Sequence, residues 1–120
     1  MKIAVTSQGN ELSSLVDPRF GRAKWIILYD TDSGQYEAHD NVLNLNAAQG
    51  AGIQTAKNVA NLGAEAVITA NVGPNAFRTL NAAGVKIFIA EQQAVQDAID
   101  SFKAGKLKEV SQASVEGHWV

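Results

Sequence analysis

Three short apolar runs, rich in β-branched residues, constrain this 120-residue chain more than any other feature of its sequence. They cover residues 3–6, 66–70 and 85–89. Runs of this length are typical of strands that are buried on both faces of a sheet. Because helix-length segments precede the second and third runs, right-handed crossovers would connect the strands, which predicts that all three are parallel.

Two more strands are expected before the first helix. Residues 25–29 form an apolar run, and residues 35–40 alternate enough to form a strand, with a turn that ends in Gly34 between them. A short glycine-containing connection of this kind predicts an antiparallel hairpin. Apolar residues at helical spacing predict helices at residues 47–62, 74–83 and 94–104.

The order of these elements predicts a single α/β domain. The expected fold is a three-layer, ribonuclease-H-like motif: a mixed five-stranded sheet of order 3-2-1-4-5, with strand 2 antiparallel and helices on both faces. We expect this domain to cover residues 1–106. Residues 107–120 are expected to form a polar C-terminal tail with the composition of a flexible segment.

The composition excludes several classes of protein. With 46% hydrophobic and 18% charged residues, the chain is globular and not disordered. A formal net charge of -2 argues against a nucleic-acid partner, and the absence of cysteine excludes disulfides, thiolate-held clusters and thiol nucleophiles. The chain shows neither a signal peptide nor a membrane-spanning run, so we expect a cytoplasmic protein with no membrane partner.

The predicted topology brings loops from distant parts of the sequence to one edge of the sheet. The carboxyl ends of the parallel strands and the amino ends of the helices share this edge, where open α/β sheets bind their ligands. The segments expected there are residues 7–8, 17–22, 24, 39–40, 49–52 and 71–75.

The loop at residues 17–22, Asp-Pro-Arg-Phe-Gly-Arg, is the most informative of these segments. Arg19 and Arg22 are two permanent cations that are suited to binding oxyanions through paired hydrogen bonds. The same residues also fit a purely structural loop, in which Asp17 pairs with an arginine and Phe20 fills the core. The sequence leaves both interpretations open.

Two helix starts are expected beside this loop. Gly50 and Gly52 lie in the first turns of the first helix, where small residues allow either close helix packing or the approach of a ligand to free N–H groups. Asn71, Gly73 and Pro74 lead into the second helix, with proline at its first position. Ordinary capping explains this second segment equally well, and an anion at the helix start is the functional alternative.

Catalytic patterns are absent from the sequence. A ribonuclease-H-type nuclease needs converging carboxylates that begin on the first strand, and residues 3–7 provide none. The chain also has no nucleophile elbow and no Walker loop. We therefore expect a binding protein and not an enzyme, with no catalytic residues.

Taken in series, five segments resemble the dinitrogenase iron-molybdenum cofactor biosynthesis family, whose members are similar to nitrogenase accessory factors. The loop Asp-Pro-Arg-Phe-Gly-Arg-Ala is the most specific of them, and the others support it by their order along the chain. The five segments are residues 1–5, 17–23, 50–52, 71–76 and 84–87.

The resemblance implies a ribonuclease-H-like fold and transient binding of iron-molybdenum cofactor or an iron–sulfur precursor. Such proteins are metallocluster carriers in nitrogen fixation, and their partners are other cofactor-assembly proteins. A histidine ligand occurs in some relatives, and His39 and His118 are the two histidines available for metal binding here. The cofactor-binding residues implied by matching motifs are Arg19, Phe20, Gly21, Arg22, Gly50, Gly52, Asn71, Gly73 and Pro74.

A second hypothesis uses the same loop and helix starts. Arginines and helix N-termini bind anions in general, so a binding or regulatory module for a small anion, such as a phosphorylated metabolite, fits the same residues. A metal-dependent hydrolase on this scaffold would rest on fold analogy alone.

Overall fold

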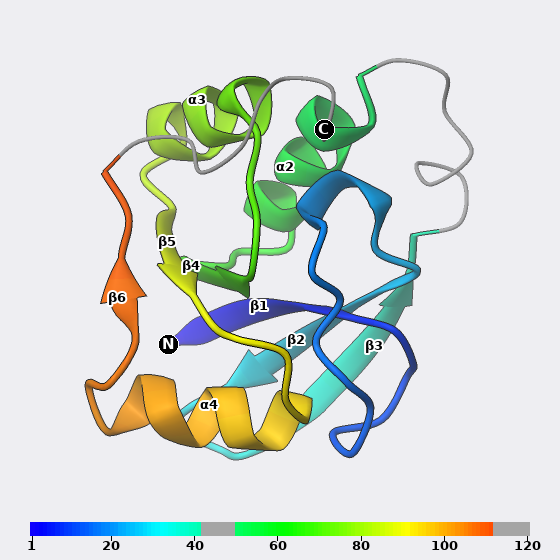
Figure 1. The fold of residues 1–120 in the computed structure, drawn as a ribbon, viewed down its shortest axis with the longest axis vertical. Helices are drawn as coiled ribbons and strands as arrows, with labels where there is room; N and C mark the ends of the chain where they lie inside the picture. The colour runs from blue at the N-terminus through cyan, green and yellow to red at the C-terminus, as the bar shows by residue number, and fades with distance from the viewer. Residues whose placement is uncertain (42–49, 112–120) are drawn as a thin grey trace.

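A mixed six-stranded sheet forms the middle layer of the protein, in the order β3-β2-β1-β4-β5-β6 (Figure 1). The computed structural model describes residues 1–41 and 50–111. Strands β1, β3, β4 and β5 run parallel to one another, and β2 and β6 run against them. The strands are β1 (Lys2–Ser7), β2 (Trp25–Asp30), β3 (Tyr36–Asp40), β4 (Ala66–Thr69), β5 (Lys86–Ile89) and β6 (Lys108–Glu109).

The predicted order 3-2-1-4-5 is confirmed, but the predicted number of strands is wrong. Beyond β5 lies β6, within the segment expected to be a tail. Its flanking apolar residues explain the pairing: Leu107 packs on the core on one side of the sheet, and Val110 packs on the other. The N–H of Val110 also donates to the carbonyl of Ile87 at 2.9 Å. A strand of two residues is too short for a periodic pattern to reveal.

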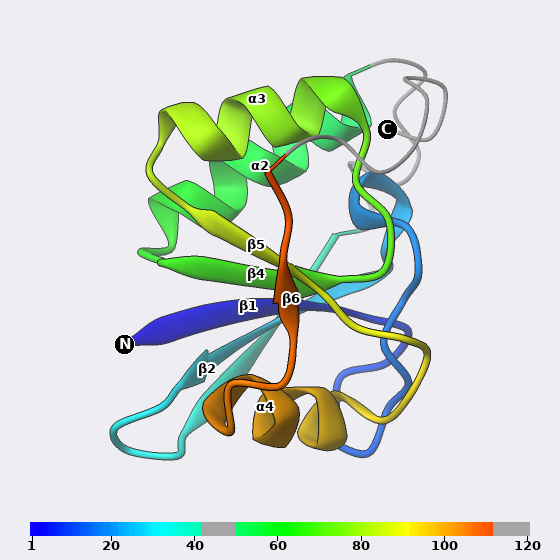
Figure 2. The same cartoon turned by 60° about the vertical axis from the view of Figure 1, so that its left-hand side comes forward.

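Helices α2 (Ala51–Asn61) and α3 (Pro74–Ala82) cover one face of the sheet, and α4 (Val95–Lys103) covers the other (Figure 2). This confirms the three-layer α/β class. Helix α2 begins later than the predicted residue 47, because Gly50 has a φ of 73°, a left-handed conformation through which an α-helix cannot continue. The earlier residues of that prediction lie outside the described part of the chain.

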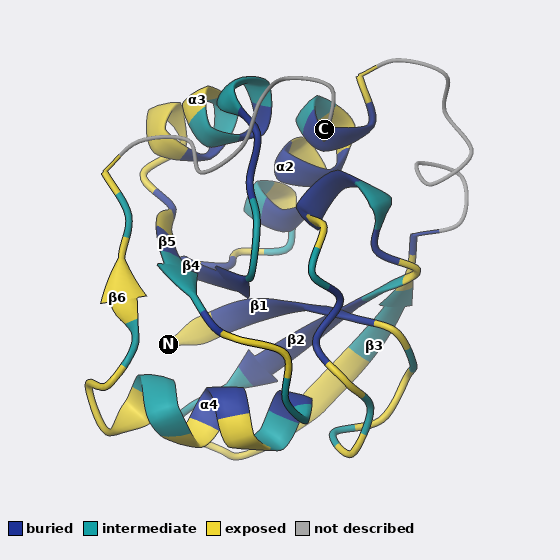
Figure 3. Cartoon of the chain, viewed as in Figure 1, coloured by how far each residue is buried: buried dark blue, intermediate teal, exposed yellow. Residues whose placement is uncertain are grey.

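Two apolar clusters hold the layers together, one on each face of the sheet. Phe20, Val59 and Leu80 belong to the cluster under α2 and α3, and Ile68 and Ile99 belong to the cluster over α4. The central strands β1 and β4 contribute alternate residues to both clusters and are buried on both faces (Figure 3). The ends of these strands are therefore fixed points to which loops can attach.

A hydroxyl pair ties the long loop after β1 to both central strands. The Thr6 hydroxyl donates to the carbonyl of Asp17 at 2.8 Å, and the hydroxyl oxygens of Thr6 and Thr69 lie 2.9 Å apart. The backbone N–H of Asp17 in turn donates to the carbonyl of Thr6 at 2.8 Å. Both threonines are buried, so no water can replace these bonds.

No helix within residues 1–41 and 50–111 combines the length and the apolar surface that crossing a bilayer requires.

We predict that Thr6→Val lowers the free energy of unfolding by about 1–3 kcal/mol, because it leaves a buried carbonyl without a donor. Urea unfolding measures this loss. Thr31→Val is the matched control, since the Thr31 hydroxyl bonds the Met1 carbonyl at the exposed surface, where water can substitute. Equal losses in the two variants would contradict the role assigned to Thr6.

Candidate functional site

The long loop after β1 is ordered along the carboxyl edge of the sheet. Its first half turns back on itself, and the N–H of Gln8 donates to the carbonyl of Leu15 at 2.9 Å. Val16 is fully buried and donates its N–H to the carbonyl of Gln93, just before α4. The buried Val16 thus anchors this half of the loop, whereas Leu15 is exposed.

The second half of the loop is fastened to the connection between β4 and α3. Arg19 and Asn71 form a parallel β-bridge, and the N–H of Phe20 donates to the carbonyl of Asn71 at 3.2 Å. The side-chain amide of Asn71 donates to the carbonyl of Pro18 at 3.0 Å. Segments 53 residues apart in sequence are therefore held side by side.

Asp17 stabilises the start of this segment from a buried position. It is 7% exposed, and its Oδ1 accepts a hydrogen bond from the backbone N–H of Arg19 at 3.0 Å. Burial raises the pKa of Asp17, while the Arg19 N–H and the nearby charges of Arg19 and Lys24 act in the opposite direction. The carboxylate therefore shapes the turn through the backbone of Arg19.

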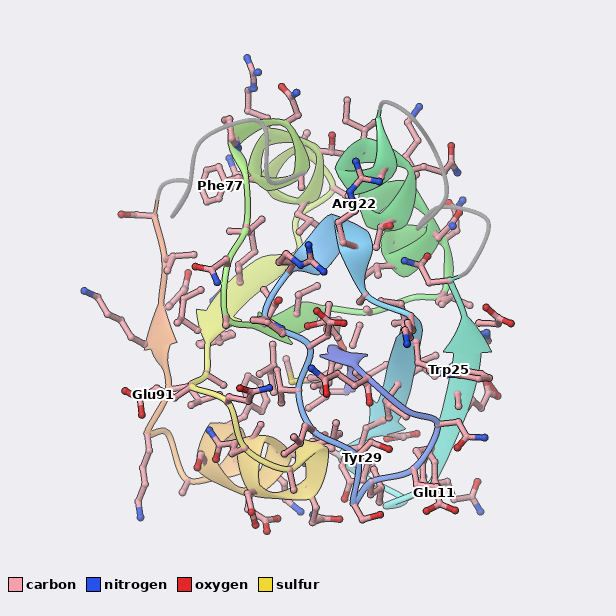
Figure 4. The ribbon with its side chains drawn as sticks, turned by 45° about the vertical axis from the view of Figure 1, so that its right-hand side comes forward. Glu11, Arg22, Trp25, Tyr29, Phe77 and Glu91 are labelled. Carbon is pink, nitrogen blue, oxygen red and sulfur yellow. The ribbon has the colours of Figure 1, made fainter. Side chains whose placement is uncertain are left out.

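Arg19 is the residue before a short 3₁₀ turn, η1 (Phe20–Arg22), and Arg22 is its last residue. Arg19 is exposed and Arg22 is half-buried, and Figure 4 shows Arg22 next to α2. Phe20 and Gly21 between them are buried, and the Phe20 ring packs in the core below α2 and α3. The buried Phe20 ring thus holds the turn against the core, and Arg19 and Arg22 are the side chains of this turn that reach the surface.

Both helix starts named by the sequence lie at this same edge (Figure 2). Gly50 is the exposed N-cap of α2, and Gly52 is buried within the helix. Gly73 is the buried N-cap of α3, and Pro74 occupies its first position, as predicted. The burial of Gly52 favours close packing of the helix, whereas Gly50 leaves the helix start open to solvent.

Asn41 belongs to this site, although the sequence gave no signal for it. It is 5% exposed, and its side-chain amide lies 2.9 Å from the Ala23 carbonyl and 3.3 Å from the Thr55 hydroxyl. Its own N–H donates to the carbonyl of Lys24. Asn41 therefore joins the end of β3, the segment after η1 and helix α2, which fixes Arg22 relative to α2.

His39 does not lie with the arginines of this site. His39 lies on β3 with its Nε2 3.1 Å from a carboxylate oxygen of Glu37. It lines a hollow of about 280 Å³ that Asn41 shares, together with Asn58 of α2 and Leu62, the residue that follows this helix. His118 lies outside the described residues. Within residues 1–41 and 50–111, no three histidine or acidic side chains come together as a metal site.

The arrangement is an open, cationic surface and not a deep pocket. Neither arginine lines any of four surface hollows of the described chain, and the largest of these, about 530 Å³, is lined by residues that include Ile89 and Lys108. What the edge offers is the Arg22 guanidinium next to α2 and the exposed Arg19, whose backbone is bridged to Asn71 before α3. Guanidinium groups and helix N-termini both favour negative charge.

The comparisons with known proteins agree with this architecture. A family model described as dinitrogenase iron-molybdenum cofactor matches residues 1–105. The apo form of the orange protein from Desulfovibrio gigas has a TM-score of 0.93 and 36% identity, with 95% of this chain and 96% of that chain covered.

Two further relatives extend across almost the whole chain. An NMR structure from Thermotoga, described as that of a candidate NifB protein, has a TM-score of 0.84 and 43% identity, over 97% of this chain and 98% of that one. An uncharacterized protein of Methanocaldococcus jannaschii is 30% identical over 110 residues, 90% of each chain.

We predict that Asn71→Ala lowers the free energy of unfolding by about 0.5–1.5 kcal/mol, through the loss of one partly buried hydrogen bond to Pro18. Amide hydrogen exchange should also quicken at Phe20, whose N–H bonds the same residue. Asn81→Ala, at an exposed position of α3, is the control and should change neither quantity. Unchanged exchange at Phe20 would show that the loop is held by other contacts.

We predict a distinct pH dependence for Asp17→Asn. Because the folded pKa of Asp17 is raised, the native state holds this proton more tightly than the unfolded state. The contribution of Asp17 to stability therefore falls as pH rises above its ordinary pKa of 3.8. Asparagine keeps an acceptor for the Arg19 N–H but does not titrate. Urea unfolding between about pH 4 and 7 should therefore show that the free energy of unfolding of Asp17→Asn increases relative to that of the wild type as pH rises. Glu91→Gln, at an exposed site, should show no such change.

Proposed function

Because this chain belongs to the dinitrogenase iron-molybdenum cofactor family, we propose that it binds and carries an anionic metal–sulfur cofactor during cofactor assembly. The cargo is the iron-molybdenum cofactor or an iron–sulfur precursor of it. The protein acts as a carrier and not as an enzyme, so the proposal includes no catalytic residue.

One observation supports the proposal above all others: the attachment of residues 17–22 to Asn71. The bridge between Arg19 and Asn71 and the hydrogen bonds of Asn71 with Pro18 and Phe20 fix the backbone on which both arginines stand. Two cations on a fixed backbone can meet an anion without first ordering a loop, which lowers the entropic cost of binding.

The chemistry of the site suits such a cargo. Metal–sulfur clusters carry negative charge, and guanidinium groups donate several hydrogen bonds at once to anionic acceptors. We assign direct contact to Arg19 and Arg22, with help from the open start of α2 at Gly50. The supporting residues are Phe20, Gly21, Gly52, Asn71, Gly73 and Pro74, which shape and hold the backbone around them.

The open shape of the edge fits a carrier that releases its cargo. With no cysteine in the chain, no thiolate can bind the cluster permanently, so binding rests on charge and hydrogen bonds. His39 or His118 supplies at most one labile metal ligand in this proposal. Other cofactor-assembly proteins, in the same cytoplasmic compartment, would donate and receive the cluster.

We predict that Arg19→Ala/Arg22→Ala weakens cluster binding by about tenfold to a hundredfold, the cost of losing charge-assisted hydrogen bonds. The measurement is an anaerobic titration of the protein with isolated iron-molybdenum cofactor, followed by visible absorption and by metal analysis after gel filtration. Arg78→Ala removes an exposed arginine that bonds Asn75 on α3 and should bind like the wild type.

Two results would count against a cluster carrier. The first is wild-type protein that retains no molybdenum or iron on gel filtration, and the second is a double variant that binds as tightly as the Arg78→Ala control. A thermal-shift series with inorganic phosphate and a sugar phosphate tests the alternative. Stabilisation by phosphate compounds but not by the cluster would identify a small-anion binding module.

A further inference from the structure

Lys24 ends the loop that carries the two arginines, one residue before β2. Its side chain is exposed, although Ala23 before it is fully buried. Within residues 17–24 the exposed cations are Arg19 and Lys24, because Arg22 is half-buried next to α2 (Figure 4). The sequence puts the lysine at the carboxyl edge but does not show whether it faces the site.

The backbone of Lys24 is fixed by the neighbouring strand. The N–H of Asn41 donates to the carbonyl of Lys24 at 2.9 Å, which extends the ladder between β2 and β3 by one residue. Opposite residues of an antiparallel ladder share a face, and the Asn41 side chain lies 3.3 Å from the Thr55 hydroxyl of α2. The Lys24 side chain therefore starts on the face of the sheet that carries α2.

A single buried carboxylate lies near both exposed cations. The Oδ1 of Asp17 accepts a hydrogen bond from the backbone N–H of Arg19 at 3.0 Å. Burial raises the pKa of Asp17, and the backbone N–H groups and positive charges of both Arg19 and Lys24 lower it. Because interactions between charges weaken with distance, the Arg19 guanidinium and the Lys24 ammonium both lie within interaction range of this carboxylate.

The carboxylate of Asp17 allows the two cations to stay near each other. Its negative charge offsets the repulsion between Arg19 and Lys24, which would otherwise separate them. Two cations and one carboxylate still leave an excess of positive charge. Since Asp17 is buried and both cations are exposed, an anion that approaches from solvent meets the positive groups first.

We propose that Lys24 binds the anionic cargo directly, together with Arg19, on the solvent side of Asp17. The identity of the cargo rests on the proposed function, whereas the position of Lys24 rests on its links to Asn41 and Asp17. The Arg19 guanidinium is a rigid, planar fork of donors, and the Lys24 ammonium is a compact charge on a flexible stem. Arg19 thus orients an anion, while Lys24 neutralises it without requiring one geometry, which suits a carrier that also releases its cargo.

Carbon-13 NMR titration of the Asp17 carboxyl, in the full chain without cargo, tests the position of the ammonium group. Lys24→Gln should raise the pKa of Asp17, because it removes a nearby positive charge. Lys86→Gln is the matched control, since Lys86 is exposed at the start of β5 on the opposite edge of the sheet. An equal Asp17 pKa in the two variants would overturn the inference.

Anaerobic titration with isolated iron-molybdenum cofactor tests the contact itself. Lys24→Gln should weaken binding by about threefold to tenfold, as expected for the loss of one charged contact at the surface. Lys24→Arg keeps the charge and should restore most of the affinity, and Lys86→Gln should bind like the wild type. A lysine that only stabilised Asp17 would leave the affinity unchanged.

Labelling with acetic anhydride, followed by mass spectrometry, gives a second readout that a structural role would not change. Bound cofactor should protect Lys24 from acetylation but should not protect Lys86. If the wild type binds the cofactor, an affinity of Lys24→Gln equal to that of Lys86→Gln, or unprotected Lys24, would overturn this inference and leave the carrier function in place.

Wild-type protein that binds no cofactor would instead refute the carrier function. The same variants titrated with inorganic phosphate then decide the role of Lys24. Weaker phosphate binding by Lys24→Gln than by Lys86→Gln would support the contact with a smaller anion as its ligand. Equal phosphate binding in the two variants, or none in the wild type, would overturn it.

Discussion

The candidate site depends on one constraint: the long loop after β1 must be fixed to the ends of the two central strands. The buried Thr6 hydroxyl binds the Asp17 carbonyl and contacts Thr69, so a single side chain connects β1, β4 and the loop. Asn71, in the connection after β4, binds the same loop at a second place, through hydrogen bonds with Pro18 and Phe20. Without these buried bonds, the arginines would sit on a long flexible segment and could not share a fixed surface.

The two-sided core makes this attachment possible. Because β1 and β4 are buried on both faces, the polar groups at their ends must find protein partners. Asp17 and Asn41 are buried at this edge and bind backbone groups there. The same packing explains Phe20, whose ring enters the core while Arg19 and Arg22 on either side reach the surface.

Sequence reasoning succeeded where a pattern is local and repeated. Buried strands of residues 3–6 and 66–70, a glycine turn between two strands, and a proline at the start of α3 each carry a signal within a few residues, and the strand order follows from the handedness of crossovers. It failed where an element depends on distant contacts. β6 exists because Leu107 and Val110 pack on opposite faces of a sheet that is already formed, and Asn41 is buried only because α2 lies across it.

The sequence by itself determined the three-layer α/β class, the order of the first five strands and the gathering of residues 17–22 and 71–74 at one edge, since periodicity and chain connectivity are properties of the chain alone. Only the tertiary structure decided which side chains of that edge are available. It buried Phe20, Gly21 and Gly52, left Arg19 exposed and placed His39 beside Glu37. The reason is physical: burial and pairing depend on which surfaces meet in three dimensions, and residues far apart in the chain supply those surfaces.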